Sequence, residues 1–121
     1  MKVQKHKKFM SRITTHILDT TMGKPAEGVT IILYGGENDQ WTELARGRTN
    51  ADGRIADLLN KDDLLHYGIY KMRFETKDYF DKGPVKTFYP YVEIIFEIES
   101  DQHYHIPLLL NPFGYSTYRG S

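Results

Sequence analysis

The amino-acid sequence predicts an all-β protein, built as a sandwich of two antiparallel sheets with one short helix. Several short segments alternate apolar and polar side chains with a period of two, most clearly at residues 91–99, as expected of strands with one buried face. Short runs of Gly, Pro, Asn and Asp separate these segments and favour turns. Short strands at regular spacing are typical of β-sandwiches.

In the first half of the chain we expect strands at residues 12–19, 28–34 and 40–49. Residues 35–39 are expected to form a hairpin loop. Residues 50–53, Asn-Ala-Asp-Gly, predict a turn because Gly53 can adopt positive φ. This turn should deliver Arg54 onto a short strand.

In the second half we expect strands at residues 67–74, 91–99, 103–110 and 114–119. Residues 57–66 are expected to be helical or looped, and Thr76 to cap a helical turn over residues 77–80. Pro107 has no N–H group, so its strand should lie at a sheet edge or turn that position away from the ladder.

Length and composition restrict the class of protein. A chain of 121 residues with 40% hydrophobic and 13% aromatic side chains is expected to form one domain with a modest core. Sixteen basic side chains balance sixteen acidic ones, so we expect no nucleic-acid partner. No apolar run approaches the roughly 18 residues of a membrane span, so we expect no membrane partner. The chain has no cysteine, which excludes thiol catalysis and suits a cytoplasmic protein.

The first residues differ from the rest of the chain. Residues 1–10 contain four lysines and no long apolar stretch, so they do not resemble a secretory signal. We expect them to form a flexible basic N-terminal tail, and residues 11–121 to form the folded domain.

Histidines are the clearest candidates for a catalytic or metal-binding role. His103 and His105 stand two apart, so on a strand they point to the same face. Their pKa near neutrality suits proton transfer, but the spacing also fits a metal site or an ordinary polar rim. A zinc site would need further ligands, and His16 could supply one if its strand lies close. Arg54 is either a solvated strand cap or a group that holds an anion or polarises a carbonyl.

The C-terminus is rich in polar groups, with Tyr118, Arg119 and Ser121 close to the terminal carboxylate. Ser121 is either part of a site or a frayed end. The sequence contains no nucleotide-binding motif and no G-x-S-x-G motif.

Four segments, in order, resemble the 5-hydroxyisourate hydrolase family of purine catabolism. They are THILD with GKPA (residues 15–19 and 23–26), TNADGR (49–54), YHIPLL (104–109) and the terminal YRGS (118–121). YRGS is the most specific, because transthyretin, the hormone carrier with the same fold, lacks it. The resemblance covers about residues 11–121.

The resemblance implies a transthyretin-like sandwich whose subunits pair edge to edge and stack as a dimer of dimers. In such a homotetramer the active sites lie at the dimer–dimer interface. The period-two alternation agrees with this arrangement. It assigns to the core Ile13, Ile17, Tyr104, Ile106 and Leu108. It turns outward His16, Leu18, His105, Leu109, Ser116 and Tyr118.

The activity implied is hydrolysis of 5-hydroxyisourate to 2-oxo-4-hydroxy-4-carboxy-5-ureidoimidazoline by opening the N1–C6 bond, with no cofactor and no metal. The resemblance assigns catalytic roles to His16, Arg54, His105 and Ser121. It assigns substrate binding to Tyr118, Arg119 and His103. The histidines would activate water, and Arg54 would hold the substrate. The alternative is a non-catalytic transthyretin-like carrier of a small ligand, which would gain nothing from desolvating these polar groups.

Overall fold

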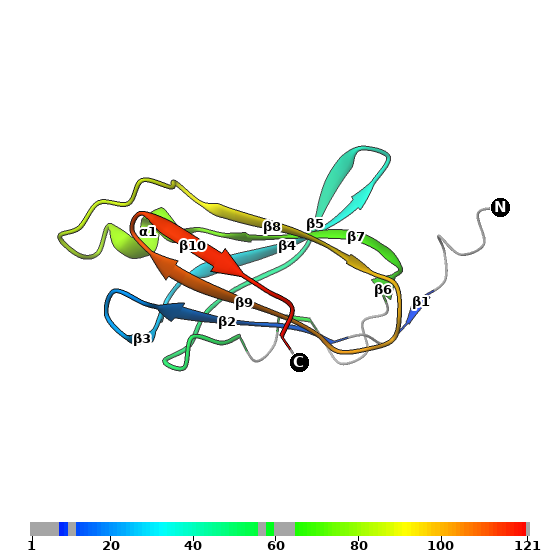
Figure 1. Ribbon diagram of the computed structural model, residues 1–121. Coiled ribbons are helices and arrows are strands. Elements are labelled where there is room, and N and C mark those ends of the chain that lie inside the picture. The colour runs from blue at the N-terminus through cyan, green and yellow to red at the C-terminus, as the bar shows by residue number, and fades with distance from the viewer. Residues whose placement is uncertain (1–7, 10–11, 56–57, 60–64, 121) are drawn as a thin grey trace.

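A computed structural model describes residues 8–9, 12–55, 58–59 and 65–120 and confirms the sandwich (Figure 1). The elements in chain order are β1 (Lys8–Phe9), β2 (Ile13–Asp19), β3 (Lys24–Pro25), β4 (Thr30–Glu37), β5 (Gln40–Arg48), β6 (Leu65–His66), β7 (Gly68–Phe74), α1 (Thr76–Phe80), β8 (Val92–Ile98), β9 (Tyr104–Asn111) and β10 (Gly114–Thr117). Two four-stranded sheets, β10-β9-β2-β3 and β5-β4-β7-β8, form the two layers, and β1 pairs with β6 at one end.

One strand pair departs from a purely antiparallel arrangement. Strands β2 and β9 run parallel, in register from Ile13 opposite Tyr104 to Asp19 opposite Leu110. Strand β9 therefore lies inside its sheet, between β2 and β10, so Pro107 does not mark an edge strand. The register also sets Thr14 beside His105, and this juxtaposition determines the site described below.

The core lies between the two sheets and takes the residues that the alternation assigned to it. Burial along β2 alternates over its whole length, with Ile13, Thr15 and Ile17 buried and Thr14 and His16 half-buried. The five predicted core residues are all at most 6% exposed. Each fully buried Ile, Leu or Phe contributes about 1.5–3 kcal/mol relative to an exposed position. Because the core uses the inward side chains, the outward side chains of the β10-β9-β2-β3 sheet are available for a functional site.

The predicted loop at residues 35–39 is wrong, because β4 continues through Glu37. The hairpin turns on Asn38 and Asp39, whose φ angles are 53° and 62°. A two-residue turn with two positive φ angles matches the twist of the flanking strands. Gly36 lies within the strand, where a Cβ atom would come 2.9 Å from the Trp41 ring. The glycines thus allow close packing there and do not form the turn.

Three further local predictions need correction or fall outside the described residues. Thr76 does not cap α1; it is the first helical residue, after the N-cap Glu75, and its buried hydroxyl has no hydrogen-bond partner among the described residues. Arg54 forms an isolated bridge with His16, not a short strand. Residues 56–57 and 60–64 lie outside the described residues, and of the predicted region 57–66 the last two residues form β6.

The predicted N-terminal tail also lies mostly outside the described residues, with only β1 placed. In the part of the chain that the structure describes, no helix is long and apolar enough to span a membrane.

A buried carboxylate holds the end of β2. Asp19 is 2% exposed, and its Oδ1 accepts hydrogen bonds from the backbone N–H groups of Thr21 and Met22. Its Oδ2 accepts a hydrogen bond of 2.7 Å from the Tyr79 hydroxyl on α1. Burial, together with this bond to a carboxylate, raises the pKa of Tyr79. Asp19 therefore ties β2 to the helix and to its own turn, because a buried charge is stable only when its hydrogen bonds are made.

Candidate active site

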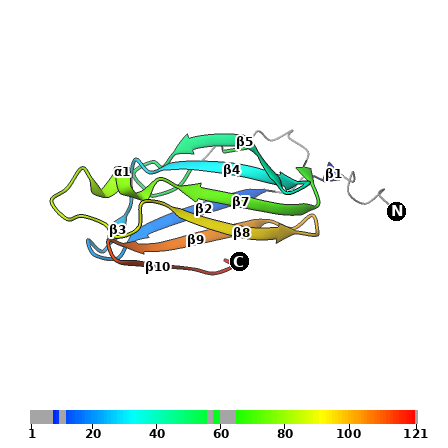
Figure 2. The ribbon, with the colours of Figure 1, turned by 90° about the horizontal axis from the view of Figure 1, so that it is seen from above.

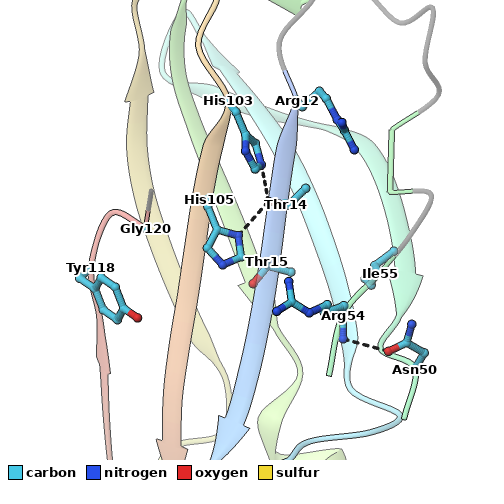
Figure 3. Close-up of a pocket in the computed structure, with 10 residues that line it drawn as sticks. All are labelled: Arg12, Thr14, Thr15, Asn50, Arg54, Ile55, His103, His105, Tyr118 and Gly120. Atoms are coloured by element: carbon cyan, nitrogen blue, oxygen red, sulfur yellow. Dashed lines mark hydrogen bonds between the residues drawn. The ribbon is translucent and has the colours of Figure 1, made fainter. Parts of the chain in front are cut away.

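A pocket of about 630 Å³ opens on the outer face of the β10-β9-β2-β3 sheet. Four parts of the chain contribute side chains to it: β2 and the residue before it, the start of β9, the turn after β5, and the segment after β10 (Figure 3). The lining residues are Arg12, Thr14, Thr15, Asn50, Arg54, Ile55, His103, His105, Tyr118 and Gly120. The pocket thus gathers segments from both ends of the chain.

The turn at residues 50–53 forms as predicted and positions Arg54. The side-chain oxygen of Asn50 accepts hydrogen bonds from the backbone N–H groups of Asp52 and Arg54, at 2.9 and 3.1 Å. Gly53 has φ +74° and lies so close to β2 that a Cβ atom would come 2.5 Å from the carbonyl oxygen of Ile17. The Gly53 carbonyl in turn accepts a hydrogen bond from the Ile17 N–H. Only glycine fits here, and the close contact brings Arg54 to His16.

Thr14 connects the two histidines that the sequence placed on one face. Its hydroxyl oxygen lies 2.6 Å from Nε2 of His103 and 2.8 Å from Nδ1 of His105, both hydrogen-bond distances (Figure 3). His103 is exposed and His105 is half-buried. The second ring nitrogen of His105, Nε2, is directed into the space between His105, Arg54 and Tyr118. It is therefore the nitrogen available to a bound molecule.

The surroundings of His105 favour its neutral form. Burial lowers the pKa of His105 most, and the positive charge of Arg54 lowers it further, because desolvation and a like charge both disfavour an imidazolium. A neutral imidazole at physiological pH can accept a proton, so His105 has the electrostatic environment of a general base.

The C-terminal segment closes one side of the pocket. The Gly120 N–H donates a 2.9 Å hydrogen bond to the His105 carbonyl, and a Cβ atom at Gly120 would lie only 2.5 Å from Cδ2 of the His105 ring. Tyr118 lines the pocket and remains 58% exposed. The glycine of the terminal YRGS segment thus lets the backbone pack directly on the imidazole.

The structure does not bring every predicted residue into the pocket. The Arg119 guanidinium stacks over the Tyr104 ring at 4.5 Å and donates to the side-chain oxygen of Gln102, so it points away from the pocket lining. His16 is not a lining residue, but its ring lies against Gly53 and its backbone bridges Arg54. Ser121 lies outside the described residues, so its predicted role stays a prediction.

Sequence reasoning missed Arg12, Thr14 and Asn50. Arg12, Thr14 and His16 alternate along one expected strand and so share a face, but this alternation carries no information about which strand lies beside them. Asn50 was assigned only to a turn. Among the described residues, no three His, Asp or Glu side chains come together in an arrangement that could hold a metal ion. The two histidines and Arg54 that line the pocket suit proton transfer and anion binding.

Comparison with known proteins gives consistent results. The HIUase/transthyretin family matches residues 13–120. The chain is 45% identical to the 5-hydroxyisourate hydrolase of Mus musculus, over 92% of this chain and 96% of the mouse protein. The structure superposes on the 5-hydroxyisourate hydrolase of Klebsiella pneumoniae with a TM-score of 0.79 and 40% identity, covering 95% of this chain and 97% of that one.

Transthyretin from Sparus aurata is also similar, with a TM-score of 0.83 and 32% identity, covering 89% of this chain and 95% of that one. The family match at residues 13–120 spans nearly the whole described fold and contains every lining residue of the pocket except Arg12. This chain belongs to the HIUase/transthyretin family.

Proposed function

We propose that this chain hydrolyses 5-hydroxyisourate to 2-oxo-4-hydroxy-4-carboxy-5-ureidoimidazoline, without a cofactor. The proposal is supported by relatives that carry the name 5-hydroxyisourate hydrolase. The observation that carries it is the half-buried His105, which faces a pocket shared with Arg54 and has a lowered pKa. A hydrophobic carrier would not need a poised base or an exposed guanidinium in its binding site.

In the proposed reaction, Nε2 of His105 removes a proton from the water that attacks C6 of the substrate. The negative charge that develops on the carbonyl oxygen is stabilised by Arg54, because a guanidinium interacts more strongly with an oxyanion than with a neutral carbonyl. The N1–C6 bond then breaks, and the proton held by His105 passes to the leaving nitrogen. His16 helps to orient the water, and Tyr118 and Ser121 complete the substrate pocket.

We also propose that the active form is a homotetramer in which the pocket faces a second subunit. The pocket lies on the outer face of its sheet, where a partner could cover it. Strands β8 and β10 are edge strands of the two sheets as the structure describes them, and they lie on the same side of the sandwich (Figure 2). Large apolar side chains are exposed on or near these edges, namely Phe88, Ile95 and Tyr115. A cytoplasmic location is proposed from the absence of cysteine.

The decisive test is a direct assay. When 5-hydroxyisourate is generated from urate in solution, the protein should accelerate the decay of its absorbance well above the buffer rate. Replacing His105 by Asn should lower kcat by about 10²–10⁴-fold, the usual contribution of a general base, while thermal unfolding stays within a few degrees of the native protein. Decay at the buffer rate with the native protein would contradict the proposal and favour the carrier.

The pH dependence should report the lowered pKa of His105. Because a protonated imidazole cannot accept a proton, kcat/KM should stay level as the pH falls from neutrality and decline only below about 6.5, the ordinary histidine value. Replacing Arg54 by Gln removes a positive charge that holds this pKa down, so the acid limb of the residual activity should move to higher pH. A midpoint of the acid limb at or above 6.5 in the native protein would contradict a lowered pKa of His105.

Packing of Gly120 on His105 makes a further prediction. Replacing Gly120 by Ala should displace the imidazole, because the added methyl group would overlap the ring. A displacement of about 1 Å lowers catalysis by about 10²-fold. Gly114 offers a matched control in the same C-terminal segment, since a Cβ atom there meets nothing closer than 3.8 Å. Steady-state kinetics showing equal activity for the two alanine variants would rule out this role of Gly120.

The assembly can be measured by sedimentation equilibrium. We expect a mass near four times the 14.1 kDa of one subunit. We also expect specific activity to fall on dilution below the concentration at which the assembly dissociates, because apparent stability of an assembly depends on concentration. A fully active monomer would refute the placement of the pocket between subunits.

A further inference from the structure

We propose that Thr14 is a positioning residue that sets the tautomer of His105, with His103 as the acceptor of its hydroxyl proton. The inference rests on the proposed hydrolase function for its kinetic consequence, but its structural core is independent of substrate. It assigns a role to a residue outside the predicted site, and it gives His103 a role other than substrate binding.

The argument begins with the number of protons. A threonine hydroxyl carries one proton and accepts through its lone pairs. The Thr14 oxygen faces two imidazole nitrogens, Nε2 of His103 and Nδ1 of His105. The hydroxyl can donate to only one of them, so the other must donate its own N–H to the Thr14 oxygen. The two histidine tautomers are therefore coupled through one oxygen atom.

The distances indicate the direction of the coupling. Hydrogen bonds donated by a hydroxyl are shorter than those donated by an N–H group. The contact of Thr14 with His103 is 2.6 Å and that with His105 is 2.8 Å. We therefore assign the hydroxyl proton to the shorter contact, so that Thr14 donates to Nε2 of His103 and Nδ1–H of His105 donates to Thr14. In this arrangement Nε2 of His105 keeps its lone pair, which is the state that a general base needs.

A comparison with the next residue shows how the Thr14 hydroxyl differs from one that satisfies the backbone. Thr15 faces the core and its hydroxyl donates a 2.7 Å hydrogen bond to the Ile106 carbonyl, satisfying a buried backbone group. Thr14 is half-buried on the outer face, where a β-branched residue without a hydroxyl would also suit the strand. In the part of the chain that the structure describes, the Thr14 hydroxyl contacts the rings of His103 and His105.

The coupling makes an unusual prediction about His103. If His103 is replaced by Phe, the Thr14 proton loses its acceptor and is free to donate to Nδ1 of His105. When the hydroxyl donates to Nδ1, the imidazole proton resides on Nε2, where it blocks proton abstraction. Loss of an exposed side chain should therefore change the tautomer of its neighbour and slow the reaction, although His103 does not itself take the proton from water.

The experiment measures tautomers and kinetics in the full-length protein. Histidine side-chain nitrogens are observed by ¹⁵N NMR in the native protein and in Thr14→Val, Thr14→Ser and His103→Phe. Steady-state kinetics with 5-hydroxyisourate are recorded for the same set. Thr20→Val is the matched control, since Thr20 follows the same strand and its hydroxyl donates to the Leu110 carbonyl, away from the pocket.

We expect the native protein and Thr14→Ser to hold the His105 proton on Nδ1, and Thr14→Val and His103→Phe to shift it towards Nε2. In these two variants kcat should fall about tenfold or more, a part of the full general-base contribution, with KM changed by less than about threefold, because the lost interaction acts in the transition state. Thr14→Ser should stay within about threefold of the native kcat, and Thr20→Val should match it.

An unchanged His105 tautomer in Thr14→Val overturns the proposal, whatever happens to the rate. A shifted tautomer with an unchanged kcat overturns its link to catalysis. If the native protein shows no hydrolysis at all, the proposed function fails, while the tautomer measurement still decides the structural part.

Discussion

The parallel pairing of β2 with β9 is the constraint on which the site depends. It places Thr14 opposite His105 and His16 opposite Pro107, so residues from the two ends of the chain share one surface. A shift of one residue would turn every outward side chain into the core, and the buried alternation of Ile13, Thr15 and Ile17 opposes such a shift. Asp19 adds a polar anchor at the end of β2, because its buried carboxylate is satisfied only when the turn after the strand and Tyr79 are both in place. The positions of the side chains in the site thus depend on the packing of the core beneath the sheet.

In the β10-β9-β2-β3 sheet, the inner face stabilises the fold and the outer face carries the reactive groups. Inward side chains form the core with the opposite sheet, whereas the outward side chains of the same strands line the pocket. Polar groups can gather there at little cost because they remain partly solvated. They also act on one another: the positive charge of Arg54 helps to keep His105 neutral, and the same charge would attract an anionic reactant.

Shared architecture does not decide between the two activities represented among similar proteins. The sandwich resembles a transthyretin and a 5-hydroxyisourate hydrolase with TM-scores of 0.83 and 0.79. A fold supports many functions, and function resides in particular side chains. The local features of this chain that bear on function are side chains and close backbone contacts. Gly53 and Gly120 allow backbone to approach His16 and His105 more closely than any other residue would permit, and His105 lines one pocket with Arg54 and Tyr118.

The sequence by itself determined the sandwich, the inward and outward faces of its strands and the turn before Arg54, because period-two burial and turn chemistry are local properties. That His105 and Tyr118 belong to one site was implied by the family resemblance, not by a local pattern. It failed at residues 35–39, where glycines used for close packing resembled a loop, and at Thr76, whose hydroxyl is buried without a cap. Only the tertiary structure decided the parallel register of β2 and β9, the connection of Thr14 to both histidines, and the direction of Arg119 towards Tyr104 and Gln102. The physical reason is distance along the chain: the contacts of Thr14 join residues about 90 positions apart. The direction of Arg119 depends on which neighbouring side chains it contacts, and no local sequence pattern encodes either feature.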